Sequence, residues 1–144
     1  MNKKTIPVFF TIDENYTPYF SVALASLIDH TSKENDYTIN VVYQNITEES
    51  QKKLASLAKN NVHIIFTDIE EKIKPIEEKL DYSRSKTHFP ISVYFRLFLP
   101  SMFPEYDKGI YVDSDTAFNA DIAELYQIDL EDKLIGAIKD ISIS

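Results

Sequence analysis

Short apolar runs alternate with amphipathic stretches along the chain. The runs are rich in β-branched and aromatic residues, which is typical of buried strands. They predict strands at residues 6–12, 37–43, 62–66, 108–112 and 134–138. Helical spacing predicts helices from Thr17-Pro18 to His30 with Thr17 as the cap, over residues 47–60, and over residues 91–99 between Pro90 and Pro100. Residues 68–86 have room for one short helix, and residues 122–126 are ambiguous.

This alternation predicts an α/β fold with a mainly parallel sheet and flanking helices. We find no internal repeat, linker or low-complexity tract, so residues 1–144 are predicted to form a single domain.

The amino-acid composition excludes several classes of function. The chain has a net charge of −8, which argues against a nucleic-acid partner or an anionic membrane surface. It has no cysteine, which excludes a disulfide scaffold, a thiolate zinc site and a cysteine nucleophile. Its two glycines are too few for a Walker loop or a GxGxxG dinucleotide loop.

The N-terminal apolar run imitates a signal peptide, because two lysines precede it. The run is short, contains Pro7, ends in Asp13-Glu14 and lacks a small-residue cleavage site, so a first strand is the better interpretation. The stretch ISVYFRLFLPSMF is too short to cross a bilayer and contains Arg96. From the sequence we therefore expect a cytoplasmic protein without a transmembrane segment.

Acidic residues follow several of the predicted strands. Parallel α/β sheets bind their ligands outside the carboxyl ends of the strands. The first strand ends in Thr11-Ile12-Asp13-Glu14-Asn15-Tyr16, and the others end in Asp68, Asp113-Ser114-Asp115 and Lys139-Asp140. We expect these acids to gather at one edge of the sheet.

Asp113 and Asp115 are the leading candidates for a cation site. Alternate residues of an extended segment point to the same side, so both carboxylates can converge on one point. Crowded carboxylates stay ionised when a cation lies between them, and oxygen ligands favour Mg²⁺ or Mn²⁺. Diphosphate oxygens suit the positions that two carboxylates leave open. The alternative is an Asp-x-Asp pair on a solvated turn of an acidic protein.

Two other metal-dependent motifs fit less well. A calcium loop that starts at Asp113 would end at Glu124, but it needs a ligand at Ala117 and a glycine at Phe118. A phosphatase of the haloacid dehalogenase type needs its threonine at Ala117, whereas Thr116 comes one residue early. We reject the first and regard the second as weak.

Other candidates have both a structural and a functional interpretation. Arg96 either pairs or reaches solvent as a structural residue, or it clamps a ligand or Asp113. Asp13 either caps a helix or accepts from a nucleotide base, and Tyr16 either packs in the core or stacks on the base. His30 and His63 look structural; His88 precedes the helix of Arg96 and is harder to dismiss.

Taken together, these motifs resemble glycosyltransferase family 8, which includes bacterial lipopolysaccharide galactosyl- and glucosyltransferases and glycogenin. The resemblance covers nearly the whole chain in four blocks that come in the family's order. They are VFFTIDENYTPYFSVALASL, TEESQKKLASL (the least specific), ISVYFRLFLPSMFPEYDKGIYVDSDT and DIAELYQIDLEDKLIGAIKD.

The resemblance implies a GT-A (Rossmann-like) nucleotide-diphospho-sugar transferase fold and retaining transfer of a hexose from UDP-glucose or UDP-galactose with Mn²⁺ or Mg²⁺. The acceptor would be a glycan or a lipopolysaccharide-type carbohydrate. By position, the implied roles are uridine binding for Asp13, Asn15 and Tyr16, a lining role for Thr11, Ile12 and Glu14, and donor-sugar contact for Arg96. Asp113 and Asp115 would bind the metal and the diphosphate, and the Ser114 backbone would lie near the ribose. Asp140 would be an acid on the donor or the acceptor side, and His88 would lie on the acceptor side.

The sequence departs from the family at its C-terminal end. The family's third metal ligand, a histidine in a His-x-x-Gly-x-x-Lys-type motif, is not among these residues. The chain therefore looks like the N-terminal, nucleotide-binding part of a longer enzyme. That enzyme would be cytoplasmic or peripheral at the inner membrane through its C-terminal part, and homo-oligomer formation stays open.

Two other functions remain. A phospho-signalling receiver domain would use Asp13-Glu14, Asp68 and Lys139, but it leaves Arg96 and the Asp-x-Asp pair without a role. A non-catalytic fragment would bind nothing alone.

Overall fold

The computed structural model describes residues 3–77 and 91–138. The elements in chain order are β1 (Lys4–Asp13), the 3-10 turn η1 (Glu14–Tyr16), α1 (Thr17–Asp29), β2 (Asn35–Gln44), α2 (Glu48–Ala55), β3 (Val62–Asp68), α3 (Ile69–Glu77), α4 (Ile91–Met102), β4 (Ile110–Tyr111) and α5 (Ile122–Tyr126). Among the described residues, no helix is long and apolar enough to cross a membrane.

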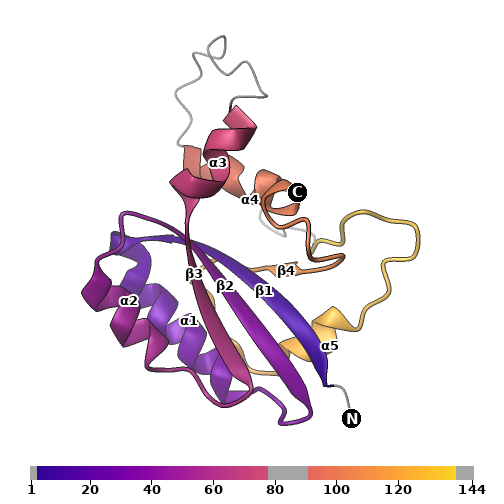
Figure 1. The fold of residues 1–144 in the computed structure, drawn as a ribbon. Helices are drawn as coiled ribbons and strands as arrows, with labels where there is room; N and C mark the ends of the chain where they lie inside the picture. The colour runs from indigo at the N-terminus through magenta and orange to yellow at the C-terminus, as the bar shows by residue number, and fades with distance from the viewer. Residues whose placement is uncertain (1–2, 78–90, 139–144) are drawn as a thin grey trace, which may run out of the picture.

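The four strands form one parallel sheet in the order β3-β2-β1-β4 (Figure 1). β1 pairs with β2 along its whole length, and Val8 and Phe9 of β1 pair with Ile110 and Tyr111 of β4. Because all strands run the same way, their carboxyl ends meet at one edge. The predicted parallel α/β architecture is confirmed.

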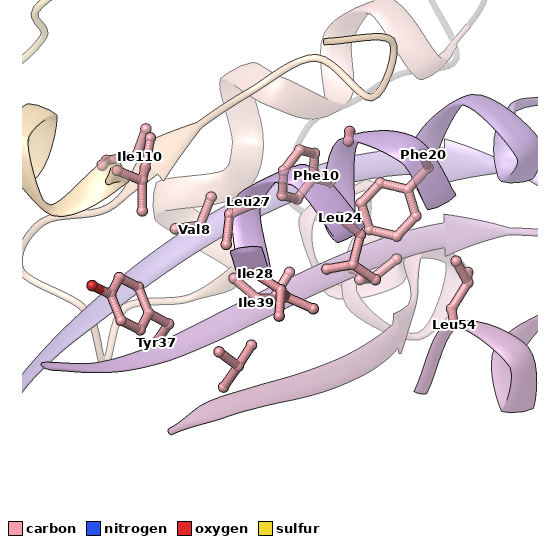
Figure 2. Close-up of a cluster of buried hydrophobic side chains, with 14 of the residues drawn as sticks. Val8, Phe10, Phe20, Leu24, Leu27, Ile28, Tyr37, Ile39, Leu54 and Ile110 are labelled. Carbon is pink, nitrogen blue, oxygen red and sulfur yellow. The ribbon is translucent and has the colours of Figure 1, made fainter. Parts of the chain in front are cut away.

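One face of the sheet is covered by α1 and α2. The buried residues of α1 recur at the three- and four-residue spacing of an amphipathic helix; they are Phe20, Ala23, Leu24, Leu27 and Ile28. In Figure 2, Phe20, Leu24 and Leu27 of α1 lie against strand residues that include Phe10 and Ile39. Burying a side chain of this size stabilises the fold by about 1.5–3 kcal/mol, so this layer fixes the position of the sheet.

The opposite face packs against α4 and the segment that follows it. Phe95, Leu99, Met102 and Phe103 are buried there together with Phe9 and Val42 of the sheet and with Ile69, the first residue of α3. The ring of Phe9 lies 5.1 Å from that of Phe103 and 5.6 Å from that of Tyr106, centroid to centroid. This second cluster holds α4, and therefore Arg96, beside β1 and β4.

A buried polar contact joins α5 to the start of β2. The hydroxyl of Tyr37, whose residue is fully buried, donates to the Asp121 carboxylate, with 2.8 Å to each oxygen. Asp121 also caps α5 by accepting from the backbone N–H of Ala123. Burial raises the pKa of the Tyr37 phenol, so the hydroxyl keeps the proton that it donates.

Helix boundaries differ from the sequence prediction at three points. α4 does not stop before Pro100 but continues to Met102, because a proline in the last turn removes a single donor and leaves the Phe103 N–H free to bond Leu99. α2 ends earlier than predicted. After Ala55 the backbone forms hydrogen bonds between residues three apart, such as the one from the Leu57 N–H to the Leu54 carbonyl, in place of the four-residue bonds of an α-helix. Thr17 is the first residue of α1 and not its cap.

The predicted strand at residues 134–138 is wrong. That segment has no strand hydrogen bonds, and the exposed fractions of Leu134, Ile135 and Ile138 are 96%, 79% and 91%. An apolar run indicates that a segment tends to be buried, but a strand forms only where a neighbouring strand is available for backbone hydrogen bonds. β4, the neighbouring edge, is itself only two residues long, against the five predicted.

Candidate functional site

Polar side chains from β1 and β4 meet at the carboxyl edge of the sheet. Thr11 Oγ1 lies 3.1 Å from the Tyr111 hydroxyl, and that hydroxyl donates to Asp113 Oδ1 at 3.0 Å. Phe9 pairs with Tyr111 in the sheet, so the parallel register brings Thr11 beside the end of β4. The side chain of Asp113 is 58% exposed, which leaves it open to a ligand.

Arg96 of α4 faces the same carboxylate. Its Nη1 lies 4.0 Å from Asp113 Oδ1, and its guanidinium carbon lies 5.7 Å from the centroid of the Tyr111 ring. The Arg96 side chain is 47% exposed, so the ion pair adds little to stability. Arg96 therefore combines both sequence interpretations: it reaches solvent and it faces Asp113.

Tyr111 connects the core with this polar cluster. Its ring packs against the second core cluster, while its hydroxyl lies between Thr11 and Asp113. Burial raises the pKa of the phenol; the Thr11 hydrogen bond opposes this rise, and the negative charge of Asp113 adds to it. The phenol thus stays protonated and acts as a donor to the carboxylate.

The loop after β1 is stabilised by contacts among its own residues. Asp13 Oδ1 accepts from the Tyr16 backbone N–H at 3.1 Å and so caps η1. Tyr16 is 46% exposed, and its ring centroid lies 5.9 Å from that of Tyr19. Asn15 is exposed, whereas the Ile12 side chain is buried in the core and leaves only its backbone for the loop.

Glu14 fixes this loop to the start of α2. Its carboxylate accepts from the Thr47 backbone N–H at 2.9 Å and from the Ser50 hydroxyl at 2.7 Å. These contacts lower the pKa of Glu14, with the Thr47 backbone as the largest cause and Ser50 next. The Glu14 side chain thus supports the loop from the α2 side.

A turn follows Asp113. The Thr116 hydroxyl donates to the Asp113 backbone carbonyl at 2.9 Å, Ser114 is 7% exposed, and Asp115 is exposed. Within residues 3–77 and 91–138, no three histidine, aspartate or glutamate side chains gather closely enough to hold a metal ion. In the part that is described, a cation at this edge would therefore draw on two carboxylates only.

The other sequence candidates lie apart from this cluster or outside the described residues. Asp68 ends β3, and β2 separates it from β1. His30 and His63 are exposed, and His30 Nδ1 lies 2.8 Å from the Ser26 carbonyl at the end of α1. Asp140, Lys139 and His88 lie outside the described residues.

A shallow hollow at the opposite, amino edge of the sheet is rich in lysine. It is lined by Lys3, Lys33, Lys59, Asn60 and Asn61. Lys3 lies 3.6 Å from Asp36 and Lys59 lies 3.2 Å from Asp29, nitrogen to oxygen. Because carboxylates already offset two of the three lysines, this hollow is a poor anion site.

Sequence comparison identifies the family. The model of the family described as glycosyl transferase family 8 matches residues 7–143, and the chain belongs to this family. A putative glycosyltransferase of Haemophilus influenzae is 27% identical over 97% of the chain and 41% of its own length. The lipopolysaccharide 1,2-glucosyltransferase of Escherichia coli is 25% identical over 96% of the chain and 40% of its own length.

Solved structures confirm the fold. The apo structure of the bifunctional glycosyltransferase WbbM has a TM-score of 0.83 and 31% identity, over 99% of this chain and 24% of that one. The galactosyltransferase LgtC, solved with donor and acceptor sugar analogues, has a TM-score of 0.64 and 23% identity, over 88% of this chain and 44% of that one. The fold is that of the GT-A glycosyltransferases. The chain spans about two fifths of the length of the Haemophilus influenzae and Escherichia coli relatives.

Sequence analysis missed three residues that shape this edge. Tyr111 lies two positions before Asp113 on an extended segment, and this spacing alone places both on one side. Thr47 caps α2 and precedes two acidic residues, which is a usual signal of a helix start, and Ser50 lies in the first turn, but nothing in the sequence connects either residue with Glu14. That pairing depends on the three-dimensional approach of two loops.

Proposed function

We propose that this chain is the nucleotide-sugar-binding part of a retaining hexosyltransferase. The donor would be UDP-glucose or UDP-galactose, the metal Mn²⁺ or Mg²⁺, and the acceptor a carbohydrate of the glycan or lipopolysaccharide type. The observation that carries the proposal is the convergence of Thr11, Tyr111, Asp113 and Arg96 at the carboxyl edge, beside the loop after β1. The names of the Escherichia coli relative and of LgtC support the substrate class.

The chemistry of the oxygen donors fits a hard divalent cation. Asp113 and Asp115 offer carboxylate oxygens, which Mn²⁺ and Mg²⁺ prefer, and both residues are exposed. When bound, the cation would act as a Lewis acid that offsets negative charge on the diphosphate. Two protein ligands leave coordination positions for diphosphate oxygens, which agrees with a site that assembles only with the nucleotide.

The loop after β1 suits the nucleoside. Tyr16 exposes almost half of its surface and its ring can stack on uracil. Asp13 uses Oδ1 to cap η1, so its second carboxylate oxygen is the one to accept from the base N–H. Asn15 adds an exposed amide, and the Ser114 backbone lies beside Asp113 where the ribose would reach.

Arg96 suits the donor sugar and the leaving group. A guanidinium carries five donors in a planar fork and keeps its charge at any working pH. The fork lies beside Asp113 and is partly exposed, so it can reach an anionic group held at this edge. As the bond between the sugar and the diphosphate breaks, negative charge grows on the departing UDP, and Arg96 stabilises it.

Retention of configuration needs no covalent intermediate in this proposal. The acceptor hydroxyl attacks the anomeric carbon from the face that the UDP leaves and passes its proton to the departing diphosphate oxygen, while Arg96 holds the leaving group on that side. Asp140 and His88 belong to the acceptor side of the proposal as sequence predictions, since both lie outside the described residues.

Calorimetric titration of UDP tests the proposal. We expect binding that requires Mn²⁺ and that disappears in EDTA and in the double variant Asp113→Asn/Asp115→Asn. The matched control is Glu70→Gln/Glu71→Gln, which removes the same charge from two exposed positions of α3 and should bind like the parent protein. Equal binding with and without the metal, or no binding at all, would contradict the proposal.

The receiver-domain interpretation is superseded by family membership. The topology also opposes it, because β2 lies between the carboxyl ends of β1 and β3 and keeps Asp13 and Asp68 on separate, non-adjacent strands.

A further inference from the structure

A chain of two hydrogen bonds ends on one oxygen of the Asp113 carboxylate. Tyr111 has a single phenolic proton and donates it to Asp113 Oδ1, because an ionised carboxylate can only accept. The Thr11 hydroxyl, 3.1 Å away, must then donate to the Tyr111 oxygen. The result is a directed chain from Thr11 through Tyr111 to Asp113.

Arg96 approaches the same oxygen. Its Nη1 lies 4.0 Å from Asp113 Oδ1, and its guanidinium lies over the Tyr111 ring. Among the described residues, no hydrogen bond reaches the other oxygen, Oδ2. The described residues thus hold one carboxylate oxygen and leave the second without a hydrogen bond, on a side chain that is 58% exposed.

The Tyr111 ring is a rigid base for this arrangement. It packs against the core cluster that contains Phe9, and the backbone of Val112 bonds to the Phe9 carbonyl at 3.0 Å, which fixes the end of β4. An aromatic side chain with a buried ring and a polar tip loses little freedom when it forms a hydrogen bond. The Asp113 side chain would otherwise rotate freely, since it is more than half exposed.

We propose that Tyr111, supported by Thr11, is a positioning residue that sets the orientation of the Asp113 carboxylate for the metal and diphosphate. The inference rests on the function proposed above, because it needs Asp113 to bind the metal-nucleotide complex. In this role Tyr111 acts on the metal and the diphosphate only through Asp113. Outer partners that orient a metal-binding carboxylate typically contribute about 10–100-fold in affinity.

The test compares Tyr111→Phe, which removes only the hydroxyl, with Tyr106→Phe. Tyr106 is a matched control because its ring packs in the same cluster, against Phe9. Calorimetry gives the UDP affinity of each full-chain variant with Mn²⁺ and in EDTA, and thermal unfolding gives its midpoint. We expect Tyr111→Phe to lower the Mn²⁺-dependent affinity by about tenfold or more, with Tyr106→Phe unchanged.

A double-variant cycle separates positioning from a general structural role. In an Asp113→Ala background, Tyr111→Phe should cause no further loss, because alanine has no oxygen to accept from the Tyr111 hydroxyl. Thr11→Val, which removes the donor behind Tyr111, should cause a smaller loss in the same direction. A merely structural role would lower the midpoint and reduce binding in both backgrounds.

The outcomes distinguish this inference from the proposed function. If the parent protein binds UDP with Mn²⁺ and Tyr111→Phe matches Tyr106→Phe, the positioning role is wrong and the proposed function stands. A loss of equal size in the Asp113→Ala background also overturns the positioning role. If the parent protein shows no metal-dependent binding, both the proposed function and the role of Tyr111 fail.

Discussion

Arg96 and Asp113 belong to different elements, yet the guanidinium Nη1 lies 4.0 Å from the carboxylate Oδ1. α4 carries Arg96 on an exposed position of an otherwise apolar helix, and β4 delivers Asp113 to the carboxyl edge. Both side chains are about half exposed, so this relationship contributes little to stability. The proposed function gives this placement a role, because both side chains can reach one ligand at the edge of the sheet.

Arg96→Lys separates ligand binding from folding. Lysine keeps the charge but loses the planar fork. We expect the free energy of unfolding to change by less than about 1 kcal/mol, because the pair is exposed. The affinity for a UDP-hexose should fall by about tenfold, which corresponds to one charge-assisted hydrogen bond. Parallel titrations with UDP and a UDP-hexose check this, and equal losses for both would argue against contact with the sugar.

Glu14→Gln should change the acid dependence of stability. The folded-state pKa of Glu14 lies below its ordinary value because the Thr47 backbone and Ser50 donate to the ionised form. The unfolded state therefore takes up its proton first as the pH falls, so this contribution is present above about pH 4.3 and is lost as the pH drops through the folded-state pKa. Glutamine accepts at every pH, and the variant should lose less stability on acidification.

Urea unfolding from pH 7 down to pH 3 measures this effect. The matched control is Glu34→Gln, an exposed carboxylate between α1 and β2. The interpretation fails if Glu14→Gln and the control lose stability in parallel over the acid range.

Gly109→Ala should destabilise the protein. A Cβ at this position would lie 2.6 Å from Cε2 of Phe9, and the Phe9 ring is held by Phe103 and Tyr106. Overpacking of this kind costs about 1–3 kcal/mol. Urea unfolding should show that loss, and because Gly109 precedes β4, Mn²⁺-dependent UDP binding should weaken as well.

Gly136→Ala is the matched control for that change. Its added Cβ would meet only the end of the flexible Leu130 side chain, at 2.9 Å. We expect a change within about 0.5 kcal/mol. Similar losses at both glycines would show that the contact with Phe9 is not the cause.

Asp121→Ala should be more damaging than an ordinary surface change. It removes the cap of α5 and leaves the buried Tyr37 hydroxyl without its acceptor. The two effects together predict a loss of about 3 kcal/mol in the free energy of unfolding. Tyr37→Phe should cost less, because Asp121 keeps its bonds to Ser32 and Ala123. A double-variant cycle measures the coupling, which would be near zero if the network were unimportant.

Much of the fold could be predicted from local pattern. The run VFFTI is apolar on both faces and became the central strand β1, and the spacing of Phe20, Leu24, Leu27 and Ile28 became the buried side of α1. LIGAI has the same local character, yet it is exposed, because strand formation depends on a partner that the pattern does not contain. The prediction that α4 would end before Pro100 was wrong, because a proline in the last turn of a helix removes only one hydrogen bond.

The sequence predicted that the candidate site would lie at the carboxyl edge of the sheet, but it did not predict the hydrogen bonds within that site. Asp13, Arg96 and Asp113 were found because charged residues beside apolar elements stand out. Tyr111 did not stand out, since it fits the strand pattern, and nothing in the sequence showed that its hydroxyl meets that of Thr11, a contact set by the register of β1 with β4. Contacts set by register and by the approach of separate loops lie beyond single-sequence reasoning.

Paramagnetic broadening by Mn²⁺ tests the location of the site most directly. Nitrogen-15-labelled protein would be mixed with UDP, and Mn²⁺ would be added in substoichiometric steps while the amide signals are recorded. We predict that signals from residues 111–116 and 11–16 broaden first, with those around Lys3, Lys33 and Lys59 at the opposite edge unaffected. Broadening that begins elsewhere, or no selective broadening at all, would contradict a metal-nucleotide site at Asp113.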